Sequence, residues 1–329
     1  MKNKLMRIFS ILFTVAVTVC AISWLTDKRT YSAWEINNDT THAGTIQWAP
    51  FLWADETLND RHFERTAMFI PCKVEGIPNM VTFQFDLGAD LTGIYQNNIS
   101  SFYKQHPELE GRIKKLKSPL QFWNRNLFYE NLQLSFGGYT AASYIAFLYK
   151  KYGERLDHIS PGDTVHLGTI GSDMFKNRIL VIDYPGQKFA ICETLPGELN
   201  NISFVDIELD RHNRAILPMT IKGKSYRILF DNGSSLFPLI TEAKNIDRYS
   251  ASPYTDTIQV SSWGEVHNVT GRLIKDSFQL AGQTFSNIMV YANHGGKGID
   301  KATDGMAGNA LFWNKTIVID FKNRKFGVR

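Results

Sequence analysis

The chain contains one structural unit twice, and this duplication limits the folds that it can adopt more than any other feature. Each copy has an aspartate in a short glycine-containing turn between two apolar runs, Asp86 in the first and Asp231 in the second. Upstream of each aspartate, a proline precedes a glycine by five residues, in residues 71–76 and 218–223. Apolar runs bounded by turn residues are typical of buried strands. The two aspartates are therefore predicted to lie in matching turns of two related units.

A second pair of matching blocks lies further downstream. Residues 171–191 align without gaps with residues 308–328, and eight of the 21 positions are identical. The first block begins 85 residues after Asp86, and the second begins 77 residues after Asp231. We infer two homologous lobes, each of which contributes one aspartate in a turn.

The fold class follows from the dominance of short apolar segments with strand periodicity. The sequence predicts an all-β protein with a few short helices, arranged as two homologous β-rich lobes. The expected divisions are an export segment (1–25), a stalk with one lead-in strand (26–65), an N-terminal lobe (66–195) and a C-terminal lobe (196–329).

Several elements of the first lobe are specific enough to be tested individually. A helix is expected within residues 98–116, limited by Pro107. The predicted strands are residues 67–74, 81–86, 132–136, 179–183 and 188–191.

The N-terminus is typical of an export signal. Lys2, Lys4 and Arg7 precede an uncharged apolar run from Ile8 to Leu25. This run is at the short limit for a membrane span and is longer than the apolar region of many signal peptides. We expect export, with the segment either cleaved after Ala21 or retained as a membrane anchor. The remaining chain is then extracytoplasmic: periplasmic, at the cell surface or secreted.

The charge and the histidines exclude other classes of function. The formal net charge is +4, and removing residues 1–21 deletes three basic and no acidic residues, which leaves +1. The basic residues of 112–117 are expected on a solvated helix face, so no nucleic-acid partner is predicted. The eight histidines show no metal-ligand spacing. We expect neither a metal nor another cofactor.

Two of the three cysteines lie in the body of the chain. Cys72 and Cys192 fall near the start and the end of the first lobe, whereas Cys20 belongs to the export segment. In an oxidising compartment Cys72 and Cys192 can pair, and two buried free thiols are the alternative.

The duplicated turns resemble those of a known enzyme family. Asp86 to Thr92 (DLGADLT) and Asp231 to Ser235 (DNGSS) resemble the two active-site turns of bilobal, pepsin-like aspartic proteases. The first turn also resembles the single turn of the retropepsin-like enzymes, including an aspartate four residues later, Asp90. Residues 169–171 and 306–308 resemble the apolar-apolar-glycine element that threads each turn in this family.

The resemblance implies a central cleft between the lobes, with Asp86 and Asp231 as the catalytic pair. Two carboxyl groups held a few Å apart share one proton, as in the aspartic proteases themselves. The pair then activates water against a peptide bond of an extended peptide or protein substrate. The implied supporting turn residues are Gly88, Ala89, Gly233 and Ser234, and Ser234 is expected to donate to its aspartate.

The chain departs from the family pattern directly after each aspartate. The family has Thr or Ser there, and these hydroxyl groups brace the two turns against each other. Here the positions hold Leu87 and Asn232, of which only Asn232 can donate a side-chain hydrogen bond. Asp90 either braces its own turn or contacts substrate. Trp123 and Trp263 are the candidate aromatic residues of flaps that cover a substrate.

Two functions therefore follow from the sequence. The first is an exported aspartic-type endopeptidase that uses Asp86 and Asp231. The alternative is a catalytically inactive relative that binds peptides or a partner protein in the same cleft. Leu87 favours the inactive protein, whereas retention of both aspartates and both turn glycines favours the enzyme.

Overall fold

The computed structural model describes residues 33–38, 46–58, 60–115, 126–262, 264–295 and 302–329. Strands dominate these ranges, and the helical elements are short. The helical elements are α2 (Gln96–Ser100), α3 (Glu108–Gly111) and the 3₁₀ turns η1 (Ser172–Phe175), η2 (Gly197–Leu199), η3 (Ala243–Arg248) and η4 (Asn309–Leu311). The prediction of an all-β protein with a few short helices is confirmed.

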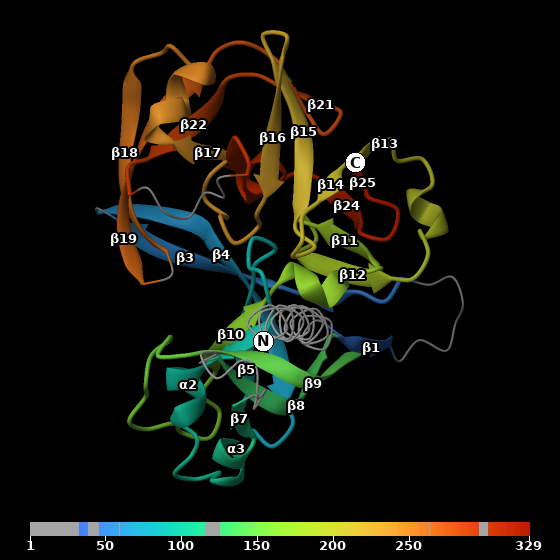
Figure 1. Cartoon of the computed structure of the whole chain (residues 1–329), viewed down its shortest axis with the longest axis vertical. Coiled ribbons are helices and arrows are strands. Elements are labelled where there is room, and N and C mark those ends of the chain that lie inside the picture. The colour runs from blue at the N-terminus through green and yellow to red at the C-terminus, as the bar shows by residue number, and fades with distance from the viewer. Residues whose placement is uncertain (1–32, 39–45, 59, 116–125, 263, 296–301) are drawn as a thin grey trace, which may run out of the picture.

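The lower part of the molecule in Figure 1 is built on one mixed sheet, here called the first-lobe sheet. Its described strands run in the order β1-β9-β6-β10-β5-β4-β8-β7, and β3 pairs with β4. The strands are β1 (Glu35–Asn38), β3 (Leu52–Leu58), β4 (Arg61–Val74), β5 (Val81–Phe85), β6 (Gly93–Tyr95), β7 (Ile113–Lys115), β8 (Leu127–Phe136), β9 (Tyr139–Tyr149) and β10 (Val165–Ile170).

The upper part is built on a second mixed sheet, the second-lobe sheet, shown in yellow to red. Its described strands run in the order β18-β19-β22-β17-β23-β16-β15-β20-β21, and β14 pairs with β15. The strands are β14 (Glu208–Leu209), β15 (Ala215–Ile221), β16 (Lys224–Phe230), β17 (Leu239–Glu242), β18 (Tyr254–Ser262), β19 (Glu265–Ile274), β20 (Phe278–Leu280), β21 (Gln283–Phe285), β22 (Ile288–Asn293) and β23 (Gly305–Ala307).

A third sheet, the shared sheet, joins the two repeats. Its described order is β13-β25-β24-β11-β12-β2. The strands are β2 (Ala49–Pro50), β11 (Ile179–Asp183), β12 (Lys188–Cys192), β13 (Phe204–Asp206), β24 (Thr316–Asp320) and β25 (Lys325–Val328). At its centre, β11 and β24 are antiparallel with Val181 opposite Val318, which is its counterpart in the aligned repeat. The duplicated segments therefore pair with each other about a local two-fold axis.

The tested elements of the first lobe agree with the prediction, apart from the helix. The predicted strand 179–183 coincides with β11, and the other four predicted strands overlap β4, β5, β8 and β12. The predicted helix over residues 98–116 is wrong in extent. The chain there forms α2, α3 and then β7, because Ile113–Lys115 pairs with β8. The basic residues of this strand are therefore not on a helix.

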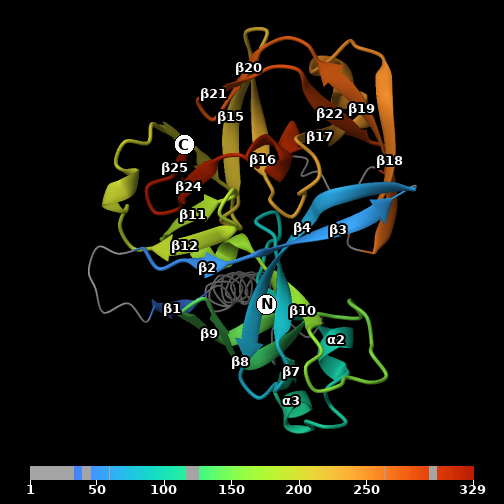
Figure 2. The same ribbon diagram turned by 180° about the vertical axis from the view of Figure 1, so that it is seen from behind.

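The segment expected as a stalk contains more strand than predicted. Residues 35–58 supply β1, β2 and β3, and residues 61–68 of β4 pair with β3 alone among the described strands. The β3–β4 hairpin extends from the first lobe and reaches β18 of the second lobe (Figure 2). Arg61 Nη1 lies 2.6 Å from Asp256 Oδ1 there, and Leu58 and Phe63 pack against the apolar cluster of the second lobe. Sequence periodicity did not reveal this hairpin because few of its side chains are fully buried.

Each strand that leads into one of the aspartate turns ends in a buried phenylalanine. Phe85 ends β5 and Phe230 ends β16, and both are fully buried. The ring of Phe230 packs against Phe312 and Phe326, with ring centroids 5.7 Å away in both contacts. The residue that follows each phenylalanine therefore emerges at the edge of a well-packed core.

Two sequence questions receive partial answers. Cys72 and Cys192 are both free thiols in the structure, and Cys72 is buried. No helix in the described ranges is both long and apolar enough to cross a membrane. The segment Ile8 to Leu25 lies outside the described residues.

Truncating Phe230 tests this packing. Phe230→Ala should lower the free energy of unfolding by about 3–5 kcal/mol, because the deletion leaves a cavity between fixed aromatic rings. Phe230→Leu should cost less, because it fills part of that space. Urea unfolding followed by circular dichroism measures both. Equal losses in the two variants would contradict the packing argument.

Candidate active site

The turn after β5 binds its own aspartate through backbone N–H groups. Asp86 N donates to Ile170 O at 3.0 Å, which continues the parallel pairing of β5 with β10. The N–H groups of Gly88 and Ala89 both donate to Asp86 Oδ1 at 3.0 Å. These two bonds fix the orientation of the carboxyl group of Asp86, a residue that is only 5% exposed.

The turn after β16 repeats this arrangement in the second lobe. Asp231 N donates to Ala307 O at 2.9 Å, which continues the parallel pairing of β16 with β23. Gly233 N donates to Asp231 Oδ1 at 2.8 Å. Ser234 donates to Asp231 through its backbone N–H, which lies 3.2 Å from the carbonyl oxygen.

A glycine directly after β10 and another directly after β23 pack against the two turns. A Cβ atom on Gly171 would lie 2.9 Å from Ala89 O, and one on Gly308 would lie 1.9 Å from Ser234 O. Both distances are too short for a side chain. Residues 171 and 308 are therefore restricted to glycine by the close approach of the turns.

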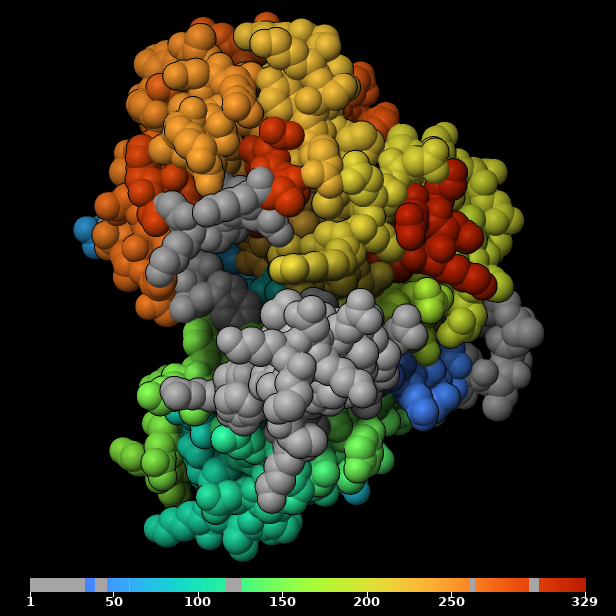
Figure 3. Space-filling model, in the orientation of Figure 1, coloured from blue at the N-terminus to red at the C-terminus, as the bar shows by residue number. Residues whose placement is uncertain are grey.

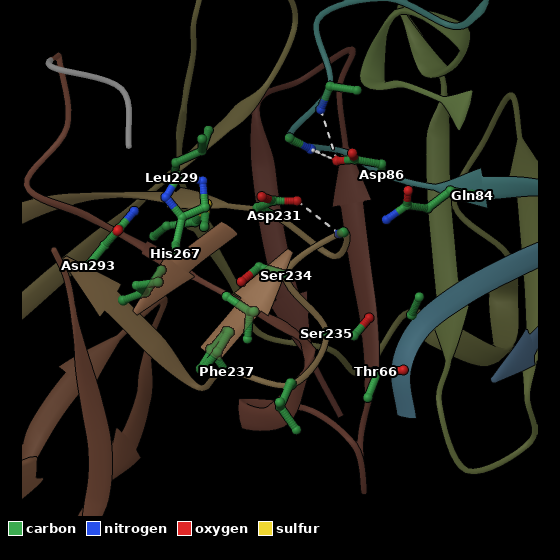
Figure 4. Close-up of a pocket in the computed structure, with 18 of the residues that line it drawn as sticks. Thr66, Gln84, Asp86, Leu229, Asp231, Ser234, Ser235, Phe237, His267 and Asn293 are labelled. Atoms are coloured by element: carbon green, nitrogen blue, oxygen red, sulfur yellow. Dashed lines mark hydrogen bonds between the residues drawn. The ribbon is translucent and has the colours of Figure 1, made fainter. Parts of the chain in front are cut away.

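The two carboxyl groups meet between the lobes, close enough for each to shift the pKa of the other. Figure 4 shows Asp86 and Asp231 side by side, each approached by the backbone of a turn. A Cβ atom on Gly88 would lie 2.3 Å from Asp231 Cγ, and one on Gly233 would lie 2.5 Å from Asp86 Cγ. Each turn glycine thus makes room for the carboxyl group of the opposite lobe.

Burial and mutual repulsion change how this pair titrates. Burial, followed by the charge of Asp231 and the hydrogen bond with it, raises the pKa of Asp86 well above its usual range. Burial also raises the pKa of Asp231, although the hydrogen bond with Asp86 and backbone N–H groups act in the opposite direction. A pair of this kind retains one shared proton at a pH where exposed carboxyl groups are ionised.

The brace between the turns is one-sided. Leu87 N donates to Asn232 Oδ1 at 2.5 Å, and Asn232 is fully buried. Asn232 therefore braces the opposite turn as an acceptor in this bond, not as the donor that the sequence suggested. Leu87 is 1% exposed and belongs to the main hydrophobic core, so its side chain stabilises the turn by packing.

Asp90 faces the other lobe. Its carboxylate lies 3.3 Å from Arg214 Nη1 and 3.6 Å from His212 Nε2, and half of the side chain is exposed. Arg214 Nη1 also donates to Gly88 O at 3.3 Å, and Arg214 is anchored by Asp210 at 2.7 Å. Asp90 therefore joins the first turn to the second lobe while it lines the cleft.

Different side chains support the two turns from below. In the first lobe, Asp173 accepts from the N–H and hydroxyl groups of Thr92 at 2.7 Å and from Trp34 Nε1 at 3.1 Å. Burial raises the pKa of Asp173 to about 6. In the second lobe, Asn309 Nδ2 donates to Asn232 O at 2.7 Å and to Ser235 Oγ at 2.8 Å.

The carboxyl pair opens into a cleft of ≈ 710 Å³ between the lobes. Figure 3 shows a recess between the yellow-orange and the green parts of the molecule. All the predicted turn residues, Gly88, Ala89, Gly233 and Ser234, line this cleft with the two aspartates. Further lining side chains that the sequence did not single out include Glu56, Thr66, Gln84, Tyr149, Tyr152, Arg214, Phe237, His267 and Asn293.

Two further predictions concern the flap aromatics and a metal site. Trp123 and Trp263, the proposed flap aromatics, lie outside the described residues. Within the described ranges, no three His, Cys, Asp or Glu side chains are arranged so that they could hold a metal ion.

Position in the aligned blocks gave a weak sequence signal for the residues that support the turns. The newly found cleft residues had no such signal. Asp173 and Asn309 lie in the aligned blocks, next to the threading glycines. Arg214 and His267 belong to neither repeated motif. Their places in the site depend on pairing between distant strands.

Comparison with known proteins was made on sequence and on structure. No protein-family model matches the chain, and no curated protein matches it. Among solved structures, an aspartic proteinase from Irpex lacteus is 10% identical, with 86% of this chain and 97% of that chain covered and a TM-score of 0.45. Basic 7S globulin from soybean is 9% identical, with 86% and 94% covered and a TM-score of 0.44.

A retropepsin-like aspartic protease from Rickettsia conorii is also similar. It is 16% identical, with 39% of this chain and 92% of that chain covered and a TM-score of 0.30. At these identities and TM-scores, the similarities say nothing about activity in the present chain.

The raised pKa of Asp86 predicts how replacing it changes stability. The unfolded carboxyl group loses its proton near its usual pKa of about 3.9, whereas the folded one holds it to higher pH, so ionisation costs stability as the pH rises. Asp86→Asn should therefore unfold at a higher temperature than the parent at pH 7, with a difference that vanishes near pH 3. Calorimetry across this pH range measures the effect.

The exposed Asp157→Asn variant is the control for the loss of one carboxylate. A parent that is more stable than Asp86→Asn at pH 7 would contradict the raised pKa.

Removing the brace tests the bond between Leu87 and Asn232. Asn232→Ala leaves the buried Leu87 N–H without its acceptor, which should cost about 1–3 kcal/mol in the free energy of unfolding. Asn232→Thr offers a hydroxyl acceptor and should recover part of that loss. Urea unfolding compares the two, and equal stability of the alanine variant and the parent would refute the brace.

Proposed function

We propose that the protein is an aspartic-type endopeptidase that hydrolyses peptide bonds through Asp86 and Asp231. The observation that carries this proposal is the close approach of two carboxyl groups, one from each lobe, in the wall of the cleft, each packed against the turn glycine of the opposite lobe. Burying two unlinked carboxylates has no structural benefit, because each costs several kcal/mol without a partner. A half-ionised pair is the state that peptide hydrolysis uses.

The chemistry follows from the shared proton. The ionised carboxyl group takes a proton from a water molecule as that water attacks the carbonyl carbon of the peptide bond. The protonated carboxyl group donates to the carbonyl oxygen, and a tetrahedral diol forms. Proton transfer to the leaving nitrogen then breaks the C–N bond. Because the titration belongs to the pair, neither Asp86 nor Asp231 is assigned the acid role alone.

The proposed substrate is a peptide or protein segment in extended conformation. The cleft lies between two sheets and is lined by backbone of both active-site turns, at Gly88 and Gly233. An extended peptide exposes N–H and C=O groups that can pair with such backbone. The cleft volume is within the usual range for ligand sites, roughly 300–1,000 Å³.

One observation favours the inactive alternative. Leu87 contributes no hydroxyl group, so the pair has a brace from Asn232 alone. In that case the cleft binds peptides or a partner protein without cleaving them. Export through Ile8 to Leu25 is part of both proposals and rests on the sequence pattern.

A peptidase assay separates the two proposals. The full chain, purified in detergent, should cleave peptides from a diverse pool, and Asp86→Asn and Asp231→Asn should each abolish cleavage. The rate should follow a bell-shaped pH profile, because activity requires one proton on the pair and falls when that proton is lost at higher pH or when a second one binds. Mass spectrometry of the products measures cleavage.

Asp183→Asn, a change at the end of β11 away from the cleft lining, is the matched control and should retain activity. No cleavage by the folded parent at any pH, or cleavage that persists in both Asn variants, would overturn the proposed function.

A further inference from the structure

The β18–β19 hairpin forms one wall of the cleft, and one position on it breaks the expected alternation. Val260 pairs with His267, and Ile258 pairs with Val269. His267 and Val269 are both buried, whereas the intervening Asn268 is exposed. The four residues of these two pairs form an inward face that is apolar except for His267.

The exposures of Val266 and His267 are the reverse of what their polarity predicts. Val266 is 66% exposed, whereas His267 is 7% exposed. A strand folding for stability alone would place the valine inward and the histidine outward. Positions that break the local pattern without a structural gain are expected at functional sites.

The buried imidazole is not satisfied by the protein. Its Nδ1 atom has no hydrogen-bond partner in the part of the chain that the structure describes. A Cβ atom on Gly295 would lie 2.1 Å from this nitrogen, so Nδ1 is packed against the Gly295 backbone. An unpaired polar group in such a place is costly, and a native structure keeps few of them.

The other edge of the ring lies on the cleft side. His267 is one of the cleft-lining residues, and Figure 4 shows it beside Asn293, across Asp231 from Asp86. The tautomer with the proton on Nε2 avoids an unpaired N–H beneath Gly295 and leaves an N–H donor for the cleft. The ring can therefore present an N–H donor to a group that enters the cleft.

The residues around this donor indicate which kind of side chain could accept a hydrogen bond from it. Apart from the amide of Asn293, the cleft lining next to this donor is mainly apolar and belongs to one hydrophobic cluster. The apolar residues that line them are Leu229, Phe237, Ile240, Val260, Val269 and Met306. A side chain that enters here needs an apolar stem and an acceptor at its end.

We propose that His267 is a specificity-determining residue that hydrogen-bonds the carboxamide or carboxylate end of a glutamine or glutamate side chain of the bound peptide. This inference rests on the proposed function for its peptide substrate. Discrimination arises because an apolar occupant of similar length leaves the buried N–H unpaired. A site built to hydrogen-bond its ligand rejects an analogue without that group more strongly than an apolar pocket rejects an extra methylene.

The experiment uses the full chain in detergent and two readouts. Peptide sets that differ at one position, with Gln, Glu, Leu or Met there, are scanned along a cleaved sequence, and kcat/KM is measured. The same peptides, labelled with fluorescein, are titrated by anisotropy against the Asp231→Asn chain. We expect one position at which Gln and Glu exceed Leu and Met by about 5- to 10-fold.

His267→Phe should abolish this preference, so that the ratio of kcat/KM between the Gln and Leu peptides falls to about one, because the change removes the hydrogen-bond donor. His267→Val, beside Val260 and Val269, repeats the test if the larger ring does not fit. His294→Phe is the matched control, because His294 is exposed, bonds Thr270 and does not line the cleft. Thermal unfolding confirms that each variant is folded.

The outcomes separate this inference from the proposed function. Cleavage with the same preference in the parent and His267→Phe, or with no Gln and Glu preference, overturns the role of His267 and leaves the peptidase intact. Preferential binding that depends on His267, without cleavage by the parent, supports His267 and overturns the peptidase. Absence of both binding and cleavage overturns both.

Discussion

The close approach of the carboxyl groups of Asp86 and Asp231 is the constraint on which the rest of the architecture depends. Two buried carboxyl groups tolerate such proximity when they share a proton and accept hydrogen bonds from backbone N–H groups. Here each turn supplies those N–H groups, and each turn glycine leaves space for the opposite carboxyl group. The parallel strand pairs beneath the turns and the packing of Phe230 hold this geometry in place.

The two lobes keep the geometry of the duplication and differ in its chemistry. The shared sheet pairs equivalent residues of the repeats, Val181 with Val318, about a local two-fold axis. Around the carboxyl pair the symmetry is broken. A buried carboxyl group, Asp173, supports one turn, whereas an amide, Asn309, supports the other. A duplicated fold thus presents two different environments to a pair of identical side chains, and burial raises the pKa of Asp86 and Asp231 against different sets of opposing contacts.

The cleft walls are also unequal. The β3–β4 hairpin of the first lobe reaches the second lobe through an ion pair, of which Arg61 is half exposed and Asp256 less so, and through two apolar side chains. The second-lobe wall carries the buried His267 in an apolar setting. In the peptidase proposed here, selectivity for a substrate side chain would depend on the second-lobe wall, whereas the reaction would depend on both lobes.

The sequence by itself determined the all-β class, the two lobes and the identity of the paired aspartates, because duplicated turns with fixed spacing are local patterns. It did not determine the β3–β4 hairpin, whose side chains are too exposed for a clear period, or β7, where pairing with β8 outweighs helix formation. Only the tertiary structure decided that Asn232 braces Leu87, that Arg214 meets Asp90 and that His267 lines the cleft. These contacts join residues far apart in sequence, and no local pattern encodes which distant strands will lie side by side.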